Sequence, residues 1–378
     1  MIGALDGTRV LELARFQAGP RCGMLLSDLG AEVIKIERLG GEETRQLAPL
    51  VDGHSIYFSV YNRGKKSVCI DLRKDAGKEV FRELVKTADL VLENFRPGTM
   101  ANMGFGYDEL CKLKPDIILI SVSGFGQSGP YRDRPGFDWL GQAMSGLMTL
   151  TGQGEDKPIG TASSIVDRCT ALHATIGALA ALRHRDRTGE GQVVDVCLLD
   201  AGLSLVEIPA IYYLETGQEG GETGRPPYRA KDGWVVISAP FKMSTRLLRA
   251  IGVTAEPSGP IGLGLQNTPL RDAVAGWCAE HTVEEICKTM QDAEVAVAPV
   301  LSIPQVTEDP HMWERKMVTR VTDEHGREAY VPGLTIKFSK TPGGLGPVPE
   351  PGQHTDEILR LLGYSGDRIE ELRQSSVI

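Results

Sequence analysis

Several features that define specialised protein classes are missing from this 378-residue sequence. It has 41 lysines and arginines against 50 aspartates and glutamates, a net charge of −9, so it lacks the basic face that nucleic-acid phosphates require. No apolar run reaches the roughly 18 residues that span a membrane, and the first residues lack the pattern of a secretion signal. We therefore expect a cytoplasmic protein that binds neither nucleic acid nor membrane.

Cysteine and histidine, seven of each, are too scattered to suggest a disulfide framework or a metal site. The cysteine count is odd and no two cysteines form a CxxC pair, a pattern typical of reduced thiols in the cytoplasm. The histidines do not cluster at the spacing of metal ligands, so we expect no structural metal.

The first third of the chain alternates apolar strand patterns with helical patterns. Strands are predicted at 9–13, 31–37, 67–72, 89–95 and 116–123. Apolar strands separated by helices indicate a parallel sheet covered on both faces, in a Rossmann-like α/β domain. Ligands of such sheets bind at the carboxyl ends of the strands, so the candidate site is formed by the loops 14–20, 38–41, 94–98 and 124–135.

A composition shift around residues 216–229, where Gly, Glu and Pro accumulate, predicts a linker into a second domain. We expect residues 1–215 to form the first part of the large domain and 216–315 a smaller α+β domain with its linkers. Residues 316–378 are expected to cross back and complete the large domain.

One glycine motif is misleading. Residues 124–129, GFGQSG, fit the GxGxxG pattern of dinucleotide-binding loops. Such a loop must open a helix whose N-terminus holds a pyrophosphate, but Pro130 and Pro135 follow it here. The first predicted strand–helix loop, 14–20, lacks these glycines. The motif is better interpreted as a turn that lets backbone approach a ligand.

Asp167 is the most informative acidic residue. It begins an alanine-rich helix predicted at 167–184, where an aspartate commonly serves as N-cap. A carboxylate at a helix N-terminus is also kept ionised and available as a nucleophile, and the two roles are compatible. Asp138 on its own suggests another cap, and Gln17 a loop side chain bonded to backbone.

Basic residues lie on several of the loops at strand ends, which on an acidic chain favours a ligand that carries phosphate. The alternative for each one is a solvated surface charge. These residues are Arg15, Arg38, Lys65, Lys66, Arg73, Lys74 and Arg96.

Considered together, these residues lie in blocks that resemble the class III CoA-transferases, the family that includes formyl-CoA transferase and the carnitine and bile-acid CoA-transferases. The similarity covers nearly the whole chain. The blocks are VLELARFQAGP at 10–20, LGAEVIKIER at 29–38, ENFRPGTMANMGFGYDEL at 93–110, SVSGFGQSGPY at 121–131, FDWLGQAMSGLMTLTG at 137–152, DRCTALHATIGALAALRHRDRTGEGQ at 167–192 and GQHTDEILRLLGYS at 352–365. Their joint order and spacing make the resemblance specific.

The resemblance implies an enzyme that moves CoA from an acyl-CoA to a carboxylic acid. It implies Asp167 as the nucleophile, Gln17 beside the reacting carbonyl and Asp138 as an acidic neighbour. It also implies an interlocked homodimer, with CoA and acyl-CoA as substrates and no tightly bound cofactor. The residues implied to line the acyl carbonyl or to bind CoA are Ala18, Arg38, Arg73, Asn94, Phe95 and Arg96.

The chain departs from the family pattern in several places. Asn102 and Pro135 stand where relatives carry a CoA-binding arginine and lysine, and the segment 216–264, where we expect substrate specificity, has no counterpart of the tetraglycine loop of formyl-CoA transferase. Phe137 replaces the histidine that related acyl-CoA racemases carry before their aspartate. The racemase alternative is therefore disfavoured, but it and a non-catalytic acyl-CoA-binding protein remain open.

Overall fold

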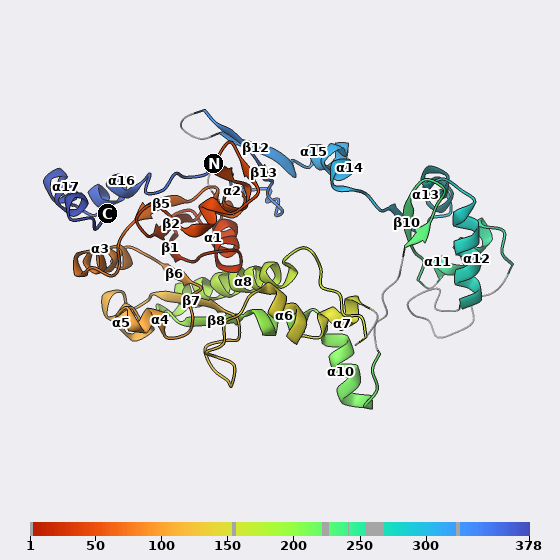
Figure 1. Ribbon diagram of the computed structural model, residues 1–378, viewed down its shortest axis with the longest axis horizontal. Helices are drawn as coiled ribbons and strands as arrows, with labels where there is room; N and C mark the ends of the chain where they lie inside the picture. The colour runs from red at the N-terminus through yellow and green to blue at the C-terminus, as the bar shows by residue number, and fades with distance from the viewer. Residues whose placement is uncertain (1–2, 153–155, 221–226, 241, 255–267, 323–325) are drawn as a thin grey trace. The chain divides into compact units, whose positions relative to one another are not determined.

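The computed structural model describes residues 3–152, 156–220, 227–240, 242–254, 268–322 and 326–378. The chain divides into two compact units (Figure 1). One unit contains residues 1–222 and 313–378, so both ends of the chain belong to it, and the other contains residues 223–312.

The first unit is built on a six-stranded parallel sheet, which confirms the predicted α/β class. The strand order is β5-β2-β1-β6-β7-β8, with every neighbouring pair parallel. Strands rich in Val, Ile and Leu pack on both faces, and all six residues of β7 are buried. The strands are β1 (Arg9–Leu13), β2 (Glu32–Glu37), β5 (Lys66–Cys69), β6 (Leu90–Glu93), β7 (Ile118–Ser123) and β8 (Val193–Cys197).

Successive residues of each strand point to opposite faces, and each face has its own core. Leu11 packs in a core with helices α3 (Asp75–Lys86), α5 (Tyr107–Leu113), α16 (Thr355–Leu361) and α17 (Gly366–Gln374). Its neighbour Val10 packs in a second core with α1 (Ala18–Asp28) and α8 (Ile165–Thr188). The last two helices of the chain thus complete a core that the first strand begins.

Helix α8 is long and apolar enough, by length and composition, to cross a membrane. In this structure it packs against α1, β7 and β8 (Figure 1). Ala171, Ala174, Ala178 and Ala181 are buried in that contact, whereas Leu172, Ile176 and Leu179 of the same helix are exposed.

Shorter elements complete the first unit. They are η1 (Glu43–Gln46), β3 (Leu50–Val51), β4 (His54–Ser55), α2 (Ile56–Asn62), α4 (Thr99–Asn102), α6 (Asp138–Met144), α7 (Leu147–Thr151), α9 (Leu198–Ser204), α10 (Glu207–Thr216), β12 (Val318–Thr322) and β13 (Glu328–Pro332). Strands β12 and β13 pair as an antiparallel hairpin.

The second unit has an antiparallel sheet in the order β11-β10-β9. Val235 and Ile237 of β10 point into a core with Ile286 and Met290. Its elements are β9 (Tyr228–Arg229), β10 (Trp234–Ser238), α11 (Lys242–Ala250), α12 (Thr268–Ala279), α13 (Val283–Asp292), β11 (Ala296–Pro299) and α14 (Ile303–Glu308), with α15 (Pro310–Glu314) at the junction with the first unit.

Candidate active site

The strand order brings the loops after β1, β6 and β7 together at one edge of the sheet, because the carboxyl ends of parallel strands share an edge. Those loops line a cavity of about 270 Å³. Gln17 and Ala18 come from the first loop, Asn94, Phe95 and Arg96 from the second, and Asp167 from the start of α8. Six of the nine residues predicted for the site therefore line one cavity.

Asp167 is the carboxylate of this cavity. It is partly buried at the third residue of α8, and no residue within the described part of the chain donates a hydrogen bond to its side chain. Burial and, to a smaller extent, the nearby negative charge of Asp138 raise the pKa of Asp167 to about 7, while Arg168 acts in the opposite direction. The result is an unusually basic carboxylate that faces a cavity, a combination typical of functional groups.

The prediction that Asp167 is the N-cap of this helix is wrong. The helix begins at Ile165 and its N-cap is Ser164, whose side chain makes no capping bond. Asp138 fulfils that role from a distance, because its Oδ1 accepts the backbone N–H groups of Val166 at 2.9 Å and Asp167 at 3.1 Å. Asp138 is thus a helix cap, as the sequence suggests, but the helix that it caps is α8. The carboxylate of Asp167 does not take part in capping this helix.

The other oxygen of Asp138 is also occupied. Gln142 Nε2 donates to Oδ2 at 2.6 Å, and Gln142 Oε1 accepts from the N–H of Thr161 at 2.8 Å. Asp138 is 5% exposed and is not among the cavity-lining residues. It binds the backbone of Asp167 from outside the cavity, so its effect on the site is electrostatic and structural.

The first loop is held in a strained conformation beside Asp167. Phe16 has a φ of +64°, in the left-handed region that side chains other than glycine rarely adopt. Asn94 exchanges two hydrogen bonds with the backbone of Arg15, accepting at 2.8 Å and donating at 2.6 Å. Gln17 Nε2 donates to the carbonyl of Ser164 at 3.3 Å. These contacts join the first loop, the second loop and the start of α8.

The remaining two predicted residues, Arg38 and Arg73, are not among those that line the cavity. Arg38 is exposed and donates to the carbonyl of Gly41 at 2.9 Å. The side chain of Arg73 is 90% exposed and pairs with Asp71 at 2.8 Å. Both follow strands of the same sheet, β2 and β5, so they continue the carboxyl edge beyond the first loop.

Arg134 is a cavity-lining residue that the pattern of the sequence did not single out. Its guanidinium lies 4.0 Å from the ring centroid of Tyr131, and no carboxylate of the described residues lies within ion-pair distance of it. Its neighbour Pro135 lines the cavity too. The two arginines in the sequence YRDR at 131–134, directly before that proline, are the feature from which a basic residue at the site could have been predicted.

Among the glycines of the GxGxxG match, Gly124 packs closely against other backbone, whereas Gly126 and Gly129 adopt positive φ angles of 88° and 85°. A Cβ on Gly124 would lie 2.6 Å from the Cα of Gly136, and both residues line the cavity. The next helix, α6, begins only at Asp138. In dinucleotide-binding sheets an acid at the end of the second strand binds the ribose. The corresponding acid here, Glu37 at the end of β2, accepts hydrogen bonds from Arg45 and Ser67, so it is not free for that role.

The expectation that substrate specificity resides in residues 216–264 falls partly outside the described residues, which exclude 221–226, 241 and 255–267. The described cavity belongs wholly to the first unit.

Comparison with known proteins identifies the family. The chain is 38% identical to succinyl-CoA–D-citramalate CoA-transferase of Chloroflexus aurantiacus, over 99% of this chain and 98% of that protein. It is 35% identical to succinyl-CoA:mesaconate CoA-transferase of Haloarcula hispanica, over 96% and 97% of the two chains. A CaiB/BaiF family protein from Brucella suis has the same fold, with a TM-score of 0.83 and 30% identity over 96% of this chain and 100% of that one. The model of CoA-transferase family III matches residues 5–355, and this chain belongs to that family.

Proposed function

We propose that this enzyme transfers CoA from an acyl-CoA donor to a carboxylic acid acceptor, with Asp167 as the group that carries CoA between them. The observation that carries this proposal is the Asp167 carboxylate itself. It faces the cavity, and the N–H groups of the second and third residues of its helix, which an N-cap side chain would normally bind, are bound by Asp138. Family membership supplies the reaction class.

The chemistry is a series of acyl exchanges with no redox step. A carboxylate oxygen of Asp167 attacks the donor thioester carbonyl, the C–S bond breaks, and a mixed anhydride forms with release of CoA thiolate. The thiolate attacks the aspartyl carbonyl and displaces the donor acid, which leaves an aspartyl-CoA thioester. The acceptor carboxylate then displaces CoA, and the returning thiolate attacks the acceptor's acyl carbonyl, which releases the new thioester and Asp167.

Each step passes through a tetrahedral oxyanion that the site must stabilise. The first N–H groups of α1 have no partner within the helix, and the positive end of the helix dipole lies there. Ala18 and Gly19 are the first two residues of this helix, and Ala18 lines the cavity. Their N–H groups, with the Gln17 amide beside them, are the proposed oxyanion donors.

CoA is proposed to lie along the carboxyl edge of the sheet. Arg73, Arg38, the first loop and Arg96 follow β5, β2, β1 and β6, which are successive neighbours in the sheet. At about 4.8 Å between strands, three steps give a path of roughly 15 Å. The exposed guanidiniums are placed for the phosphates, and Asn94 and Phe95 for the thiol end beside Asp167.

A dicarboxylic acid is the proposed acceptor class, with succinyl-CoA as the proposed donor. Relatives that match this chain over nearly its whole length are named for succinyl-CoA and for citramalate, mesaconate or glutarate. Arg15 and Arg134 line the same cavity as Asp167. An acid whose first carboxylate reacts at Asp167 can bind its second to Arg134 by charge-assisted hydrogen bonds.

A cytoplasmic homodimer is the proposed working form. Helix α8 exposes Leu172, Ile176 and Leu179, and α10 exposes Ile208, Ile211 and Leu214, the last at 76%. Exposed apolar surface on this scale indicates an interaction site, and a second copy of the chain, interlocked as the family resemblance implies, is the proposed partner.

Intact-protein mass spectrometry tests the proposal directly. After incubation with succinyl-CoA and a panel of other acyl-CoA donors, the wild-type protein should gain the mass of CoA less water, and hydroxylamine should remove that gain. Asp167→Asn should show no adduct. Asp186→Asn, an exposed aspartate near the end of the same helix, is the matched control and should form the adduct normally.

An adduct in Asp167→Asn, or continued turnover by that variant, would contradict the assignment. A racemase is disfavoured by the two engaged oxygens of Asp138, which leave no free base there, and should reveal itself by deuterium incorporation at C2 of a 2-methylacyl-CoA. A mere acyl-CoA-binding protein would bind CoA thioesters without any adduct.

A further inference from the structure

A cluster of four buried charges lies beneath the first loop of the active site. Glu12 of β1, Lys35 of β2, Glu42 and Lys65 are all shielded from solvent, and the two lysine side chains have no exposed surface. Two positive and two negative charges balance in the cluster. Burial of paired ions is costly, and its best-attested benefit is conformational specificity, so the contacts of the lysines beyond their ion pairs are informative.

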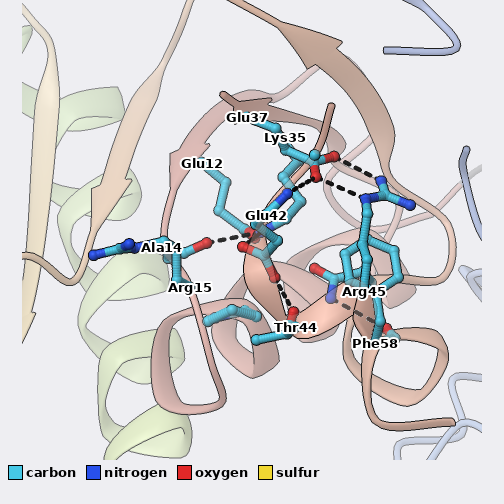
Figure 2. Close-up of polar contacts among 12 residues, drawn as sticks. Glu12, Ala14, Arg15, Lys35, Glu37, Glu42, Thr44, Arg45 and Phe58 are labelled. Atoms are coloured by element: carbon cyan, nitrogen blue, oxygen red, sulfur yellow. Dashed lines mark hydrogen bonds and ion pairs between the residues drawn. The ribbon is translucent and has the colours of Figure 1, made fainter. Parts of the chain in front are cut away.

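Lys35 uses its three N–H donors on three partners. Nζ donates to Glu12 Oε1 at 3.1 Å and pairs with Glu42 Oε2 at 3.0 Å. The third and shortest contact, 2.7 Å, is to the backbone carbonyl of Ala14. Figure 2 shows Lys35 between Glu12 and Glu42, with the Ala14 carbonyl directed at the same ammonium group.

Lys65 repeats this arrangement from the other side. Its Nζ donates to Glu12 Oε1, to Asn62 Oδ1 and to the backbone carbonyl of Pro20, each at 2.9 Å. An ammonium has three donors and no acceptor, so both lysines are fully satisfied. Glu12 is their common partner.

The two carbonyls that the lysines bind bracket the catalytic loop. Ala14 precedes and Pro20 follows the stretch 15–19, which contains the strained Phe16 and the cavity residues Gln17 and Ala18. Local sequence does not favour a φ of +64° at a phenylalanine, so the surrounding structure must impose it. Asn94 supplies a third attachment at Arg15.

We propose that Lys35 and Lys65 are positioning residues, which clamp both ends of the segment 14–20, the first loop and the start of α1, through the carbonyls of Ala14 and Pro20 and so hold the oxyanion donors and Gln17 in register with Asp167. This inference rests on the proposed function of the loop. Neither lysine is among the residues that line the cavity. The ammonium groups join a buried carboxylate to a backbone carbonyl, which an apolar side chain of similar length cannot do, because it donates a hydrogen bond to neither acceptor.

The test compares Lys35→Met and Lys65→Met with Lys66→Met in the full-length protein. Lys66 is the adjacent residue, is partly exposed, and pairs with Glu32 and Glu357 at the surface. It is not among the cavity-lining residues, and both carboxylate partners mark it as a surface charge, so it is a matched control. We would measure kcat and KM with a donor that gives the aspartyl adduct in wild type. Circular dichroism would give the folded fraction of each variant, and amide hydrogen exchange would be followed across residues 14–20.

A clamp predicts that kcat per folded chain falls roughly 10- to 100-fold in Lys35→Met and Lys65→Met, as expected for catalytic groups displaced by about 1 Å. KM for the donor should change less than about threefold, since the CoA contacts remain, and exchange at 14–20 should accelerate. Lys66→Met should retain wild-type kcat. Unchanged kcat per folded chain, or equal losses in the control, would overturn the inference.

Glu12→Gln keeps the test decisive if a lysine variant does not fold, because glutamine preserves the side-chain size and one acceptor oxygen. It should lower kcat and speed exchange at 14–20 in a folded protein, and wild-type values for both would refute the clamp. If wild type forms the adduct and the lysine variants keep wild-type kcat, the clamp is rejected but the proposed function is not. Absence of any adduct in wild type rejects the proposed function instead.

Discussion

Asp138 binds the backbone of Asp167 and leaves its carboxylate untouched. The Oδ1 atom of Asp138 accepts the N–H of Asp167 at 3.1 Å and that of Val166 at 2.9 Å. One aspartate thus satisfies the helix terminus, and the other remains available for attack. Burial is the main cause of the raised pKa of Asp167, and the negative charge of Asp138 adds to it. The residue that fixes the backbone of the proposed nucleophile therefore also contributes to its basicity.

The rate of adduct formation should depend on pH with a midpoint near 7. Burial and the charge of Asp138 raise the pKa of Asp167 to about 7, and only the carboxylate attacks, so the rate rises as pH increases through that value and then levels off. Single-turnover mass spectrometry across pH 5–9 measures this. In Asp138→Asn the midpoint should move lower, because one cause of the raised pKa is removed, whereas Asp186→Asn should match wild type.

Replacing Asp167 should stabilise the protein at alkaline pH. An acid whose pKa is raised in the folded state binds more protons folded than unfolded, so its favourable contribution is complete below the unfolded pKa of about 4 and is lost as pH rises through 7. Asp167→Asn removes the cost of a buried charge. We expect a gain of about 1–3 kcal/mol at pH 8 and little at pH 4, measured by urea unfolding. A destabilised variant at pH 8 would contradict this.

Loss of the Asp138 cap should destabilise the start of α8 and lower the free energy of unfolding. Asp138→Ala leaves two N–H groups and the Gln142 amide without their partner, and we expect a loss of about 1–2 kcal/mol of unfolding free energy. Asp138→Asn retains an acceptor oxygen and should lose less. Equal thermal melting of Asp138→Ala and wild type would show that the cap has no net effect.

Arg134 should discriminate between acceptors by their second carboxylate. In Arg134→Gln, KM for a dicarboxylic acceptor should rise roughly tenfold or more, as for loss of a hydrogen bond between charged groups, while KM for a monocarboxylic acid should hardly change. Arg132→Gln, on the same loop but not among the cavity-lining residues, is the control. Equal effects on both acids would place the second carboxylate elsewhere.

Light scattering should give a mass of twice the 41.0 kDa of one chain. Ile176 on α8 is 62% exposed, and Ile176→Arg should weaken assembly because a charge would be buried at the proposed interface. Arg183→Ala, which removes an exposed charge from the same helix, should leave the mass unchanged. A monomeric wild-type protein at micromolar concentration would contradict the dimer.

The sequence alone predicted the parallel sheet and the family, and it predicted the edge of the sheet at which the candidate site lies. Apolar strands with helical segments between them require a parallel sheet covered on both faces, so loops such as 14–20 and 94–98 had to meet at its carboxyl edge. Helix α17 and the β12–β13 hairpin were not anticipated, because their polar faces give little periodicity in a local window.

Only the tertiary structure decided how the site is held together. Asp138 and Val166 are 28 residues apart, and Lys65 binds a carbonyl 45 residues away. Local pattern shows that Asp167 begins a helix, but it cannot tell which carboxylate caps that helix or which is left free. Local preference would also have placed Phe16 at negative φ. Long-range hydrogen bonds, made once the sheet is assembled, override that preference and give the loop its shape.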